Sequence, residues 1–230
     1  MDEKRSPPLP HVPVGTEDLA ELAAAAQRCQ ACDLYRRATQ VVFGEGPAPA
    51  PMMLIGEQPG DREDLSGRPF VGPAGELLDD ALDAAEIPRE QVYLTNAVKH
   101  FKWEPRGKRR LHMKPTTSEV NACRGWLEAE IAAVRPEVIV CLGATAAQVF
   151  FGRAFRLTQS RGVLEDGAPW ASRILATFHP SALVRMKGGD EGEYTRVRRA
   201  FTLDLAEAAS AVSFRSTRVR YRGARPSASA

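Results

Sequence analysis

The chain has 230 residues, of which 43% are hydrophobic and 26% are charged, and its formal net charge is +2. This composition is typical of a soluble globular protein with one core of ordinary size. The sequence contains no run of about 18 apolar residues, which excludes a membrane-spanning helix. Residues 1–15 lack the apolar stretch of a secretory signal, so we expect a cytoplasmic protein.

Pro-rich and basic segments mark the ends of the predicted domain. We predict a flexible N-terminal segment at residues 1–15, one domain at residues 16–212 and a basic disordered tail at residues 213–230. The tail carries five arginines and no acid, and residues 99–114 carry seven basic residues and one acid. Basic clusters on a nearly neutral protein indicate local contact with phosphates. We assign that role to residues 99–114 and expect the tail only to be solvated.

Apolar strands and amphipathic helices alternate along the chain. The first helix is expected to begin at Thr16 as its N-cap, and the first strand, Met52–Ile55, runs into a loop of Gly, Pro and acidic residues. The predicted strands are 52–55, 92–95, 138–142 and 173–177, and the predicted helices are 16–28, 74–85, 117–134, 144–151 and 194–211. This alternation is typical of β-α-β units, so we predict an α/β fold whose parallel sheet is covered by helices on both faces.

Polar side chains follow three of the predicted strands. Glu57, Gln58 and Asp61 come after the first strand, Asn96 after the second and His179 after the fourth. Ligands of open α/β sheets bind beyond the carboxyl ends of the strands. Each residue alone would be an ordinary loop residue, but their convergence on one edge of the sheet indicates a binding site.

The four cysteines divide into two kinds. The Cys29-x-x-Cys32 pair in a cytoplasmic protein indicates metal or redox chemistry rather than a structural disulfide. A pair this close also suits zinc. Cys123 lies in the long predicted helix, whereas Cys141 lies inside the apolar strand VIVCL, where a free cysteine behaves as a small buried hydrophobe.

Several segments together resemble the uracil-DNA glycosylase superfamily. They are GEQPGDRED with GRPFVGPAG, then TNAVK, CLGATAAQ and HPSALVR, between about residues 29 and 185. The resemblance is strongest to the iron–sulfur branch related to family 4. The segment Lys108–His112, KRRLH, resembles the KRR-x-H loop of UdgX-type proteins, which bind uracil-containing DNA covalently. The resemblance implies a three-layer α/β/α sandwich around a small parallel sheet of about four strands.

The resemblance also implies a 4Fe-4S cluster. In cluster-bearing glycosylases one ligand is a cysteine directly after the N-x-V-K segment, whereas this chain has His100 there. Histidine replaces cysteine on the iron of Rieske centres. We therefore expect the ligands Cys29, Cys32, His100 and Cys123, and in the rival set Cys141 replaces His100. Such a cluster would brace the N-terminal helix against the long helix.

The same resemblance implies that residues at the strand ends recognise uracil. Phe70 would stack on the base, and the Asn96 amide would offer a donor to uracil O4 and an acceptor to N3–H. His179 would donate to O2 of the departing base. The remaining expected pocket and phosphate contacts are Gly56, Gln58, Asp61, Lys99, Arg109, Arg110, Ser181 and Arg185.

His112 is the residue that distinguishes the UdgX-type reading. The resemblance implies that His112 takes the place of water and bonds to C1′ of the sugar, with Glu57 orienting the ring. A neutral imidazole is a competent nucleophile near neutral pH. We predict a monomeric uracil-DNA glycosylase that favours single strands and ends as a covalent adduct. The alternatives are a turnover glycosylase whose His112 only contacts phosphate, and a non-enzymatic iron–sulfur protein that binds nucleic acid.

Overall fold

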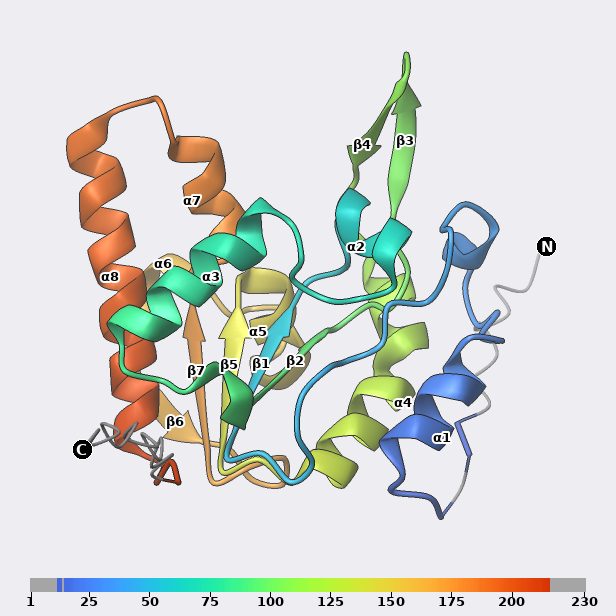
Figure 1. Cartoon of the computed structure of the whole chain (residues 1–230), viewed down its shortest axis with the longest axis horizontal. Helices are drawn as coiled ribbons and strands as arrows, with labels where there is room; N and C mark the ends of the chain where they lie inside the picture. Colours follow the sequence, from blue (N-terminus) through green and yellow to red (C-terminus); the bar gives the residue numbers. More distant parts are fainter. Residues whose placement is uncertain (1–11, 14, 216–230) are drawn as a thin grey trace, which may run out of the picture.

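The computed structural model describes residues 12–13 and 15–215, and one five-stranded sheet lies at its centre (Figure 1). The strand order is β2-β1-β5-β7-β6. The parallel strands are β1 (Met52–Gly56), β2 (Val92–Asn96), β5 (Val138–Leu142) and β7 (Arg173–Thr177). Strand β6 (Leu164–Asp166) pairs antiparallel with β7 at one edge. The predicted α/β class is confirmed, and the sheet has one strand more than expected.

The parallel strands lie where the sequence predicted them, because their apolar residues are suited to burial on both faces of the sheet. All residues of β1, β2 and β5 are buried, as near-continuous apolar runs in a parallel sheet require. Strand β6 was not predicted, since Leu-Glu-Asp carries no apolar run. Its pairing with the edge of β7, rather than its composition, makes it a strand.

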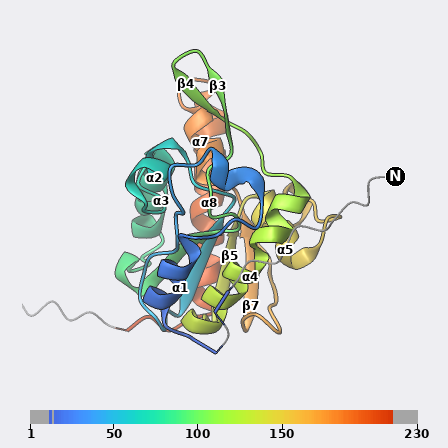
Figure 2. The same ribbon diagram turned by 90° about the vertical axis from the view of Figure 1, so that its right-hand side faces the viewer.

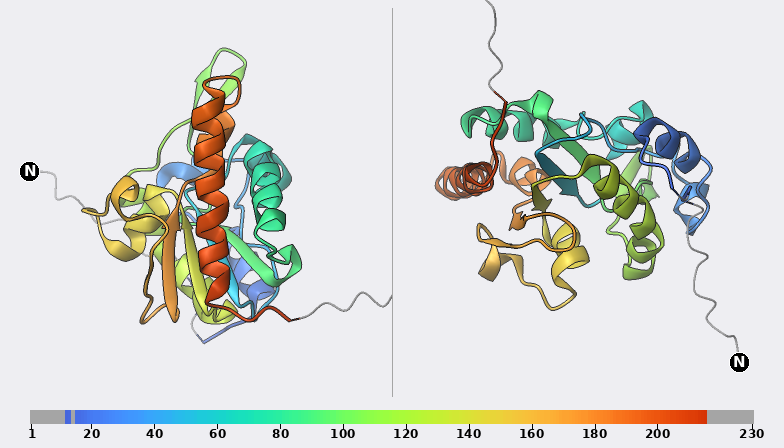
Figure 3. Two further views of the ribbon diagram at one scale, coloured as in Figure 1. Left: turned by 90° about the vertical axis from the view of Figure 1, so that its left-hand side faces the viewer. Right: turned by 90° about the horizontal axis from the view of Figure 1, so that it is seen from below.

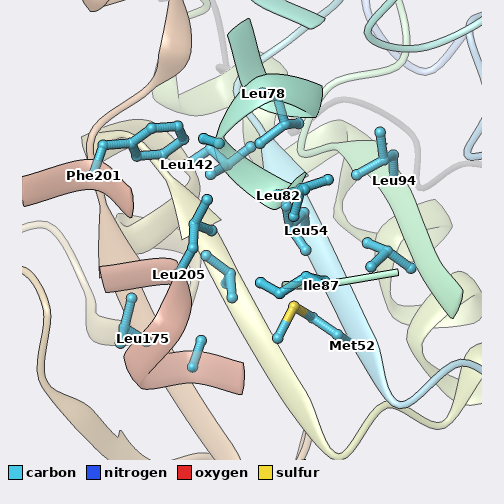
Figure 4. Close-up of a cluster of buried hydrophobic side chains, with 14 of the residues drawn as sticks. Met52, Leu54, Leu78, Leu82, Ile87, Leu94, Leu142, Leu175, Phe201 and Leu205 are labelled. Atoms are coloured by element: carbon cyan, nitrogen blue, oxygen red, sulfur yellow. The ribbon is translucent and has the colours of Figure 1, made fainter. Parts of the chain in front are cut away.

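Helices cover both faces of the sheet, as the two views of Figure 3 show. One face packs on α3 (Pro73–Ala84), α7 (Pro180–Met186) and α8 (Glu191–Ser210). Figure 4 shows this apolar layer, in which Leu54 of β1 and Leu142 of β5 meet leucines of α3 and α8. The opposite face packs on α4 (Thr117–Val134) and α5 (Ala144–Phe151). The arrangement is the expected three-layer sandwich.

Helix α1 (Leu19–Ala26) packs against the outer side of α4 (Figure 2). Its N-cap is Asp18, two residues after the predicted N-cap Thr16, and the helix ends two residues before the predicted residue 28. The Asp18 carboxylate accepts from the N–H groups of Ala20 and Glu21. Three short helices were not predicted: α2 (Asp61–Ser66), α6 (Leu157–Ser160) and α7, which each lie in segments expected to be loops.

The basic segment after β2 forms a hairpin rather than the expected loop. Strands β3 (Trp103–Arg106) and β4 (Arg109–His112) pair antiparallel and project beyond the carboxyl edge of the main sheet (Figure 1). Gly107 has φ +61° in the two-residue turn, a conformation that glycine adopts without strain. The sequence analysis did not predict this hairpin, because its strands are rich in charged residues and Pro105 lies inside β3.

The ends of the predicted domain are only partly described. Residues 213–215 of the predicted tail lie on the body of the protein, where the side chain of Gln91 bonds the backbone N–H and carbonyl of Arg215. The rest of the tail, residues 216–230, and residues 1–11 and 14 lie outside the described residues. Within the part of the chain that the structure describes, no helix has the length and hydropathy to cross a membrane.

Candidate active site

A cavity of about 620 Å³ opens at the carboxyl ends of the parallel strands. Its walls come from the loops after β1, β2, β5 and β7 and from the β3–β4 hairpin. The predicted site residues in these walls are Glu57, Gln58, Phe70, Asn96, His112, His179, Ser181 and Arg185. The fold therefore brings together side chains that are up to 128 positions apart in the chain.

Gly56, the last residue of β1, lets three of these side chains approach one another. A Cβ atom at Gly56 would lie 2.3 Å from Asn96 Oδ1, 2.8 Å from Phe70 Cζ and 3.4 Å from His179 Nε2. No real Cβ atom tolerates the first two contacts, so only glycine fits. The Phe70 and His179 rings are stacked, with centroids 6.3 Å apart and planes 26° apart. The base-binding groups expected from the sequence thus surround a single point.

The loop that carries Phe70 is held in a strained conformation. Phe70 has φ +55°, in the left-handed region that a bulky residue rarely adopts. A Cβ atom at Gly75 would lie 1.7 Å from the Phe70 carbonyl oxygen, so helix α3 packs directly on this backbone. Glu63 accepts the Gly72 N–H at 2.8 Å and fixes the other side of the loop. Such strain persists where the surroundings over-determine the backbone.

His179 presents an N–H group to the cavity. The ring caps α7, because Nδ1 accepts the Ser181 N–H at 3.1 Å. The proton of the neutral ring is therefore assigned to Nε2, the atom that faces Gly56 and the cavity. Burial lowers the pKa of His179 to about 4, and the positive charges of Arg185 and His112 add to this effect. At neutral pH the ring is an uncharged donor.

His112 and Glu57 face each other across the cavity wall. His112 Nε2 lies 3.7 Å from Glu57 Oε1, and the Thr145 hydroxyl donates to the other carboxylate oxygen. Partial burial lowers the pKa of His112, Glu57 opposes this shift and Arg185 adds to it. The side chain of His112 is 49% exposed. A neutral imidazole is therefore accessible from the cavity, and the Glu57 carboxylate lies near it at a distance longer than a hydrogen bond.

Arg110 and Asp61 lie outside the cavity, where they anchor the hairpin. Arg110 donates to Asp61 Oδ1 and to Asp64 Oδ2, each at 2.5 Å, and its guanidinium lies over the rings of Phe101 and Trp103. The Asp64 side chain is fully buried. Arg110 is thus paired with two carboxylates of α2, and the phosphate contact expected for it stays a prediction. Asp61 does not line the cavity, contrary to the pocket position expected for it.

Two further expected contacts are made within the protein. The Gln58 side chain lines the cavity, but its amide bonds the backbone of Lys102 and Met113 at the base of the hairpin, at 3.0–3.2 Å. Lys99 is only 1% exposed, and its ammonium pairs with Glu130 and donates to the Asn96 carbonyl at 2.8 Å. Lys99 cannot reach a phosphate, so that expectation is wrong. Arg109 is exposed on the hairpin, as expected.

Thr145 and Glu130 are site-supporting residues that the sequence analysis missed. Thr145 follows the carboxyl end of β5, in the same kind of position as Asn96 after β2. That position was its only signal. Glu130 is fully buried in α4 and accepts from Gly44, Tyr93, Thr95 and Lys99. The signal for Glu130 was an acid at a helical position flanked by apolar residues, seven positions after Cys123.

Three of the cysteines share one apolar cluster between α1 and α4. Cys29, Cys32 and Cys123 pack there, while Cys141 lies in a separate cluster on β5. The Trp126 indole donates to Cys29 Sγ at 3.2 Å, and the Lys99 backbone N–H donates to Cys123 Sγ at 3.3 Å. Such N–H donors are typical of thiolates that bind iron–sulfur clusters.

Cys29, Cys32, Cys123 and His100 are the residues near this cluster that could serve as metal ligands. Among the described residues, no group of three or more His, Cys, Asp or Glu is close enough to hold one metal ion. His100 is buried directly after Lys99, and burial lowers its pKa to about 4, which leaves the ring neutral as a metal ligand must be.

Comparison with known proteins assigns the family. The family model of the Uracil DNA glycosylase superfamily matches residues 43–202, a range that includes both the sheet and the walls of the cavity. A fold with an open cavity at the carboxyl edge of its parallel strands, lined by Asn96 and His179, suits this class. The chain belongs to the uracil DNA glycosylase superfamily.

Similar proteins come from several microorganisms. The Type-4 uracil-DNA glycosylase of Thermotoga maritima is 38% identical over 198 residues, which cover 84% of this chain and 95% of that protein. The Type-4 uracil-DNA glycosylase of Archaeoglobus fulgidus is 36% identical over 174 residues, or 73% of this chain and 84% of that protein. The Type-5 uracil-DNA glycosylase of Thermus thermophilus is 32% identical over 160 residues, or 61% and 68%.

Proposed function

We propose that this protein is a UdgX-type uracil-DNA glycosylase, which releases uracil from DNA and then becomes bonded through His112 to the sugar left behind. Membership of the superfamily and the names of its relatives support the excision step. The observation that carries the capture step is the position of His112, which lies in the same cavity as Asn96 and His179 with Nε2 3.7 Å from a Glu57 oxygen.

Recognition begins when the base leaves the DNA stack and enters the cavity. The exposed edge of Phe70 gives it a surface on which to stack, and Asn96 at the end of β2 meets its polar edge. The amide offers a donor to O4 and an acceptor to N3–H, whereas cytosine presents the opposite pattern at these positions. Exposed Arg185 at the cavity wall and exposed Arg109 on the hairpin are the proposed phosphate contacts. A single strand enters without unpairing, so we expect it to be favoured.

Excision breaks the bond between C1′ and the uracil nitrogen, and the departing base keeps the electron pair. The neutral His179 ring donates its Nε2–H to the oxygen on which negative charge develops. Glu57 supplies negative charge beside the sugar cation. Its position is fixed by the Thr145 hydroxyl.

Capture forms a new bond from an unprotonated ring nitrogen of His112 to C1′. The ring is cationic until it releases its remaining N–H proton to solvent, and the uracil anion gains a proton. The net change is therefore an exchange of uracil for imidazole at C1′. The lowered pKa of His112 keeps the nucleophilic form populated at neutral pH.

We also propose that Cys29, Cys32, His100 and Cys123 hold a 4Fe-4S cluster. When bound, the cluster would brace α1, α4 and the segment after β2, with no part in the reaction. The rival ligand Cys141 is disfavoured because it is fully buried in β5 among Met53, Ile55 and other residues of a different cluster. Domain limits of 16–212 and a monomeric state complete the proposal.

A uracil-containing single-stranded oligonucleotide on a denaturing gel tests the function. We expect the wild-type protein to give a shifted, denaturant-resistant band and His112→Ala to give none, while water then completes excision to an alkali-labile abasic product. Lys108→Ala, which removes a neighbouring amine, is the control and should still form the adduct.

Two results would contradict parts of the proposal. An adduct that persists in His112→Ala and needs borohydride to become permanent would indicate a lysine Schiff base instead. Uracil release without any shifted band in the wild-type protein would indicate a turnover glycosylase. The absence of both release and shift would favour a non-enzymatic binding protein.

A further inference from the structure

His112 lies on a hairpin whose own two strands do not suffice to hold it in place. Strands β3 and β4 form a separate two-stranded sheet, which projects beyond the main sheet (Figure 1). A two-stranded ribbon is marginally stable on its own. The Glu57 carboxylate does not fix the His112 ring, because the 3.7 Å between Oε1 and Nε2 exceeds the length of a hydrogen bond. The position of the ring therefore depends on the contacts that brace the hairpin.

Trp103 is the residue of β3 that lies directly opposite His112 in the hairpin register. Opposite residues of an antiparallel pair project from the same face, with Cβ atoms about 4.5–5.5 Å apart. The Arg110 guanidinium carbon lies over two rings on this face, 5.4 Å from the centroid of Phe101 and 5.5 Å from that of Trp103. The ring centroids of Phe101 and His112 are 6.0 Å apart. His112 thus shares one face of the hairpin with two aromatic side chains.

The indole of Trp103 also binds a segment that is distant in the sequence. Its Nε1–H donates to the carbonyl oxygen of Arg37 at 2.9 Å. Arg37 is the C-cap of the short helix η1 (Asp33–Arg36), and carbonyl groups at the end of a helix have no partner within that helix. The indole therefore satisfies one of these carbonyls and ties β3 to the body of the protein.

The other anchors of the hairpin act at different places. Gln58 bonds the backbone at the base of the hairpin, and Arg110 pairs with carboxylates of α2. Arg110 lies opposite Pro105 in the register, not opposite His112. Trp103 combines the two properties that the task requires, because it is the cross-strand partner of His112 and is itself bonded to the body of the protein.

We propose that Trp103 is a positioning residue for the capture step, and that it holds His112 where the ring reaches the sugar cation before water does. The two nucleophiles compete for one carbon atom, so distance and alignment decide which of them bonds to it. Asn96 and His179, which assist excision, lie at the carboxyl ends of β2 and β7, outside the hairpin. Trp103 should therefore decide which product forms without changing the rate of uracil release. This inference rests on the proposed capture by His112.

The test is the product ratio of Trp103→Ala on a uracil-containing single-stranded oligonucleotide in a single turnover. Denaturing gels separate the adduct from the free abasic product, which alkali cleaves. Both products come from the same cation, so their ratio does not depend on how much of the protein is folded. We expect the ratio of adduct to abasic product to fall by about 10- to 100-fold, since a misplacement of about 1 Å can cost about 100-fold. The rate of uracil release should stay within about twofold.

Two further variants separate the ring from its hydrogen bond and supply a control. Trp103→Phe keeps an aromatic side chain opposite His112 and loses the N–H donor, so its ratio should fall by only about 2- to 10-fold, the factor that one hydrogen bond contributes. Trp170→Ala is the matched control, because Trp170 packs against Phe150 of α5 and does not line the cavity. Its product ratio should equal that of the wild-type protein.

The same gels show which part of the account fails. An unchanged ratio in Trp103→Ala, beside a wild-type protein that forms the adduct, would overturn the positioning role and leave the proposed function intact. A slower release with an unchanged ratio would also overturn it, because Trp103 would then only support the fold. A wild-type protein that releases uracil without any adduct would refute the proposed capture, and the role of Trp103 with it.

Discussion

At the scale of single residues, the site depends on Gly56, which has no side chain, as much as on the side chains around it. Gly56 is the point on which Asn96, Phe70 and His179 converge. Gly56→Ala should displace the Asn96 amide and the Phe70 ring, and we expect uracil release to fall by at least about 100-fold, as for the loss of an oriented polar group at a reacting centre. Release kinetics measure this effect, and a thermal melt checks the fold.

Gly192→Ala is the matched control for this substitution. Gly192 lies in the first turn of α8, where a new Cβ meets only the end of the Asp190 side chain. This variant should keep full activity and gain up to about 1 kcal/mol of stability from improved helix propensity. Equal activity in Gly56→Ala and Gly192→Ala would show that Gly56 is no close-approach position.

The pH dependence of adduct formation should follow the His112 ring. Burial lowers its pKa, so the neutral, nucleophilic form predominates at pH 7 and is lost only as the pH falls through that lowered value. We expect the capture rate to stay flat from about pH 8 through the ordinary histidine pKa near 6.5 and to fall only at lower pH, as the pH passes through the lowered pKa of His112. Quenched time courses on denaturing gels measure this rate.

Uracil release by His112→Ala is the comparison for that profile. It should persist to lower pH, because burial keeps His179 neutral until about pH 4. A capture rate that rises as the pH falls from 7 to 5 would contradict the assignment, since it would require a protonated His112.

At the scale of elements, α4 joins the cysteine site to Asn96, the residue proposed to bind the base. Cys123 and Glu130 are seven positions apart, so they lie on one face of the helix. Lys99 bonds both of them, through its backbone to the Cys123 sulfur and through its ammonium to Glu130, and it also donates to the Asn96 carbonyl. One residue, Lys99, therefore connects β2, α4 and the cysteine cluster through its backbone and its side chain.

Removal of the Lys99 charge should be more damaging than removal of the whole ion pair. Lys99→Met leaves Glu130 buried without its cation, and we expect the free energy of unfolding to fall by roughly 3–5 kcal/mol. Lys99→Met with Glu130→Gln should recover most of this loss, because no charge is then buried unpaired. Urea denaturation of the purified proteins measures both values. A double variant less stable than Lys99→Met would contradict this account.

The sequence predicted those elements whose own residues decide their structure. Strands β5 and β7 and helices α4 and α5 begin and end where expected, since buried apolar runs and capping residues are local signals. The hairpin was missed because its order comes from contacts distant in sequence, such as Arg110 with Asp64. Lys99 was predicted to contact phosphate because its neighbours in sequence are basic. Its actual partner, the buried Glu130, lies 31 positions away in the chain.

The sequence predicted which residues lie at the candidate site, but not which contacts each of their side chains makes. Parallel strands end at one edge, so polar residues after β1, β2 and β7 had to meet there. Whether a given polar group faces the cavity or bonds the protein depends on neighbours that the sequence does not reveal. Gln58 and Asp61 lie three positions apart and both bond the hairpin, yet only Gln58 also lines the cavity.

At the scale of the whole molecule, iron content tests whether the fold brings the proposed cluster ligands together. We expect protein purified without oxygen to carry about four irons per chain. Cys123→Ser should lose them, because Cys123 packs with Cys29 and Cys32 in one cluster, and Cys141→Ser should retain them. Colorimetric iron assays and visible absorbance measure this content. Zinc in place of iron, or iron loss only in Cys141→Ser, would contradict the ligand set.

The two hydrogen bonds between the Gln91 side chain and the Arg215 backbone have a practical consequence for protein engineering. Gln91 immediately precedes β2, at the amino edge of the sheet, and the cavity opens at the carboxyl edge. The described chain therefore ends on the side of the molecule remote from the hairpin and from the cavity. A fluorescent reporter or affinity tag joined directly after Arg215 would start from this remote edge, so the label would not obstruct the cavity in which the proposed adduct forms.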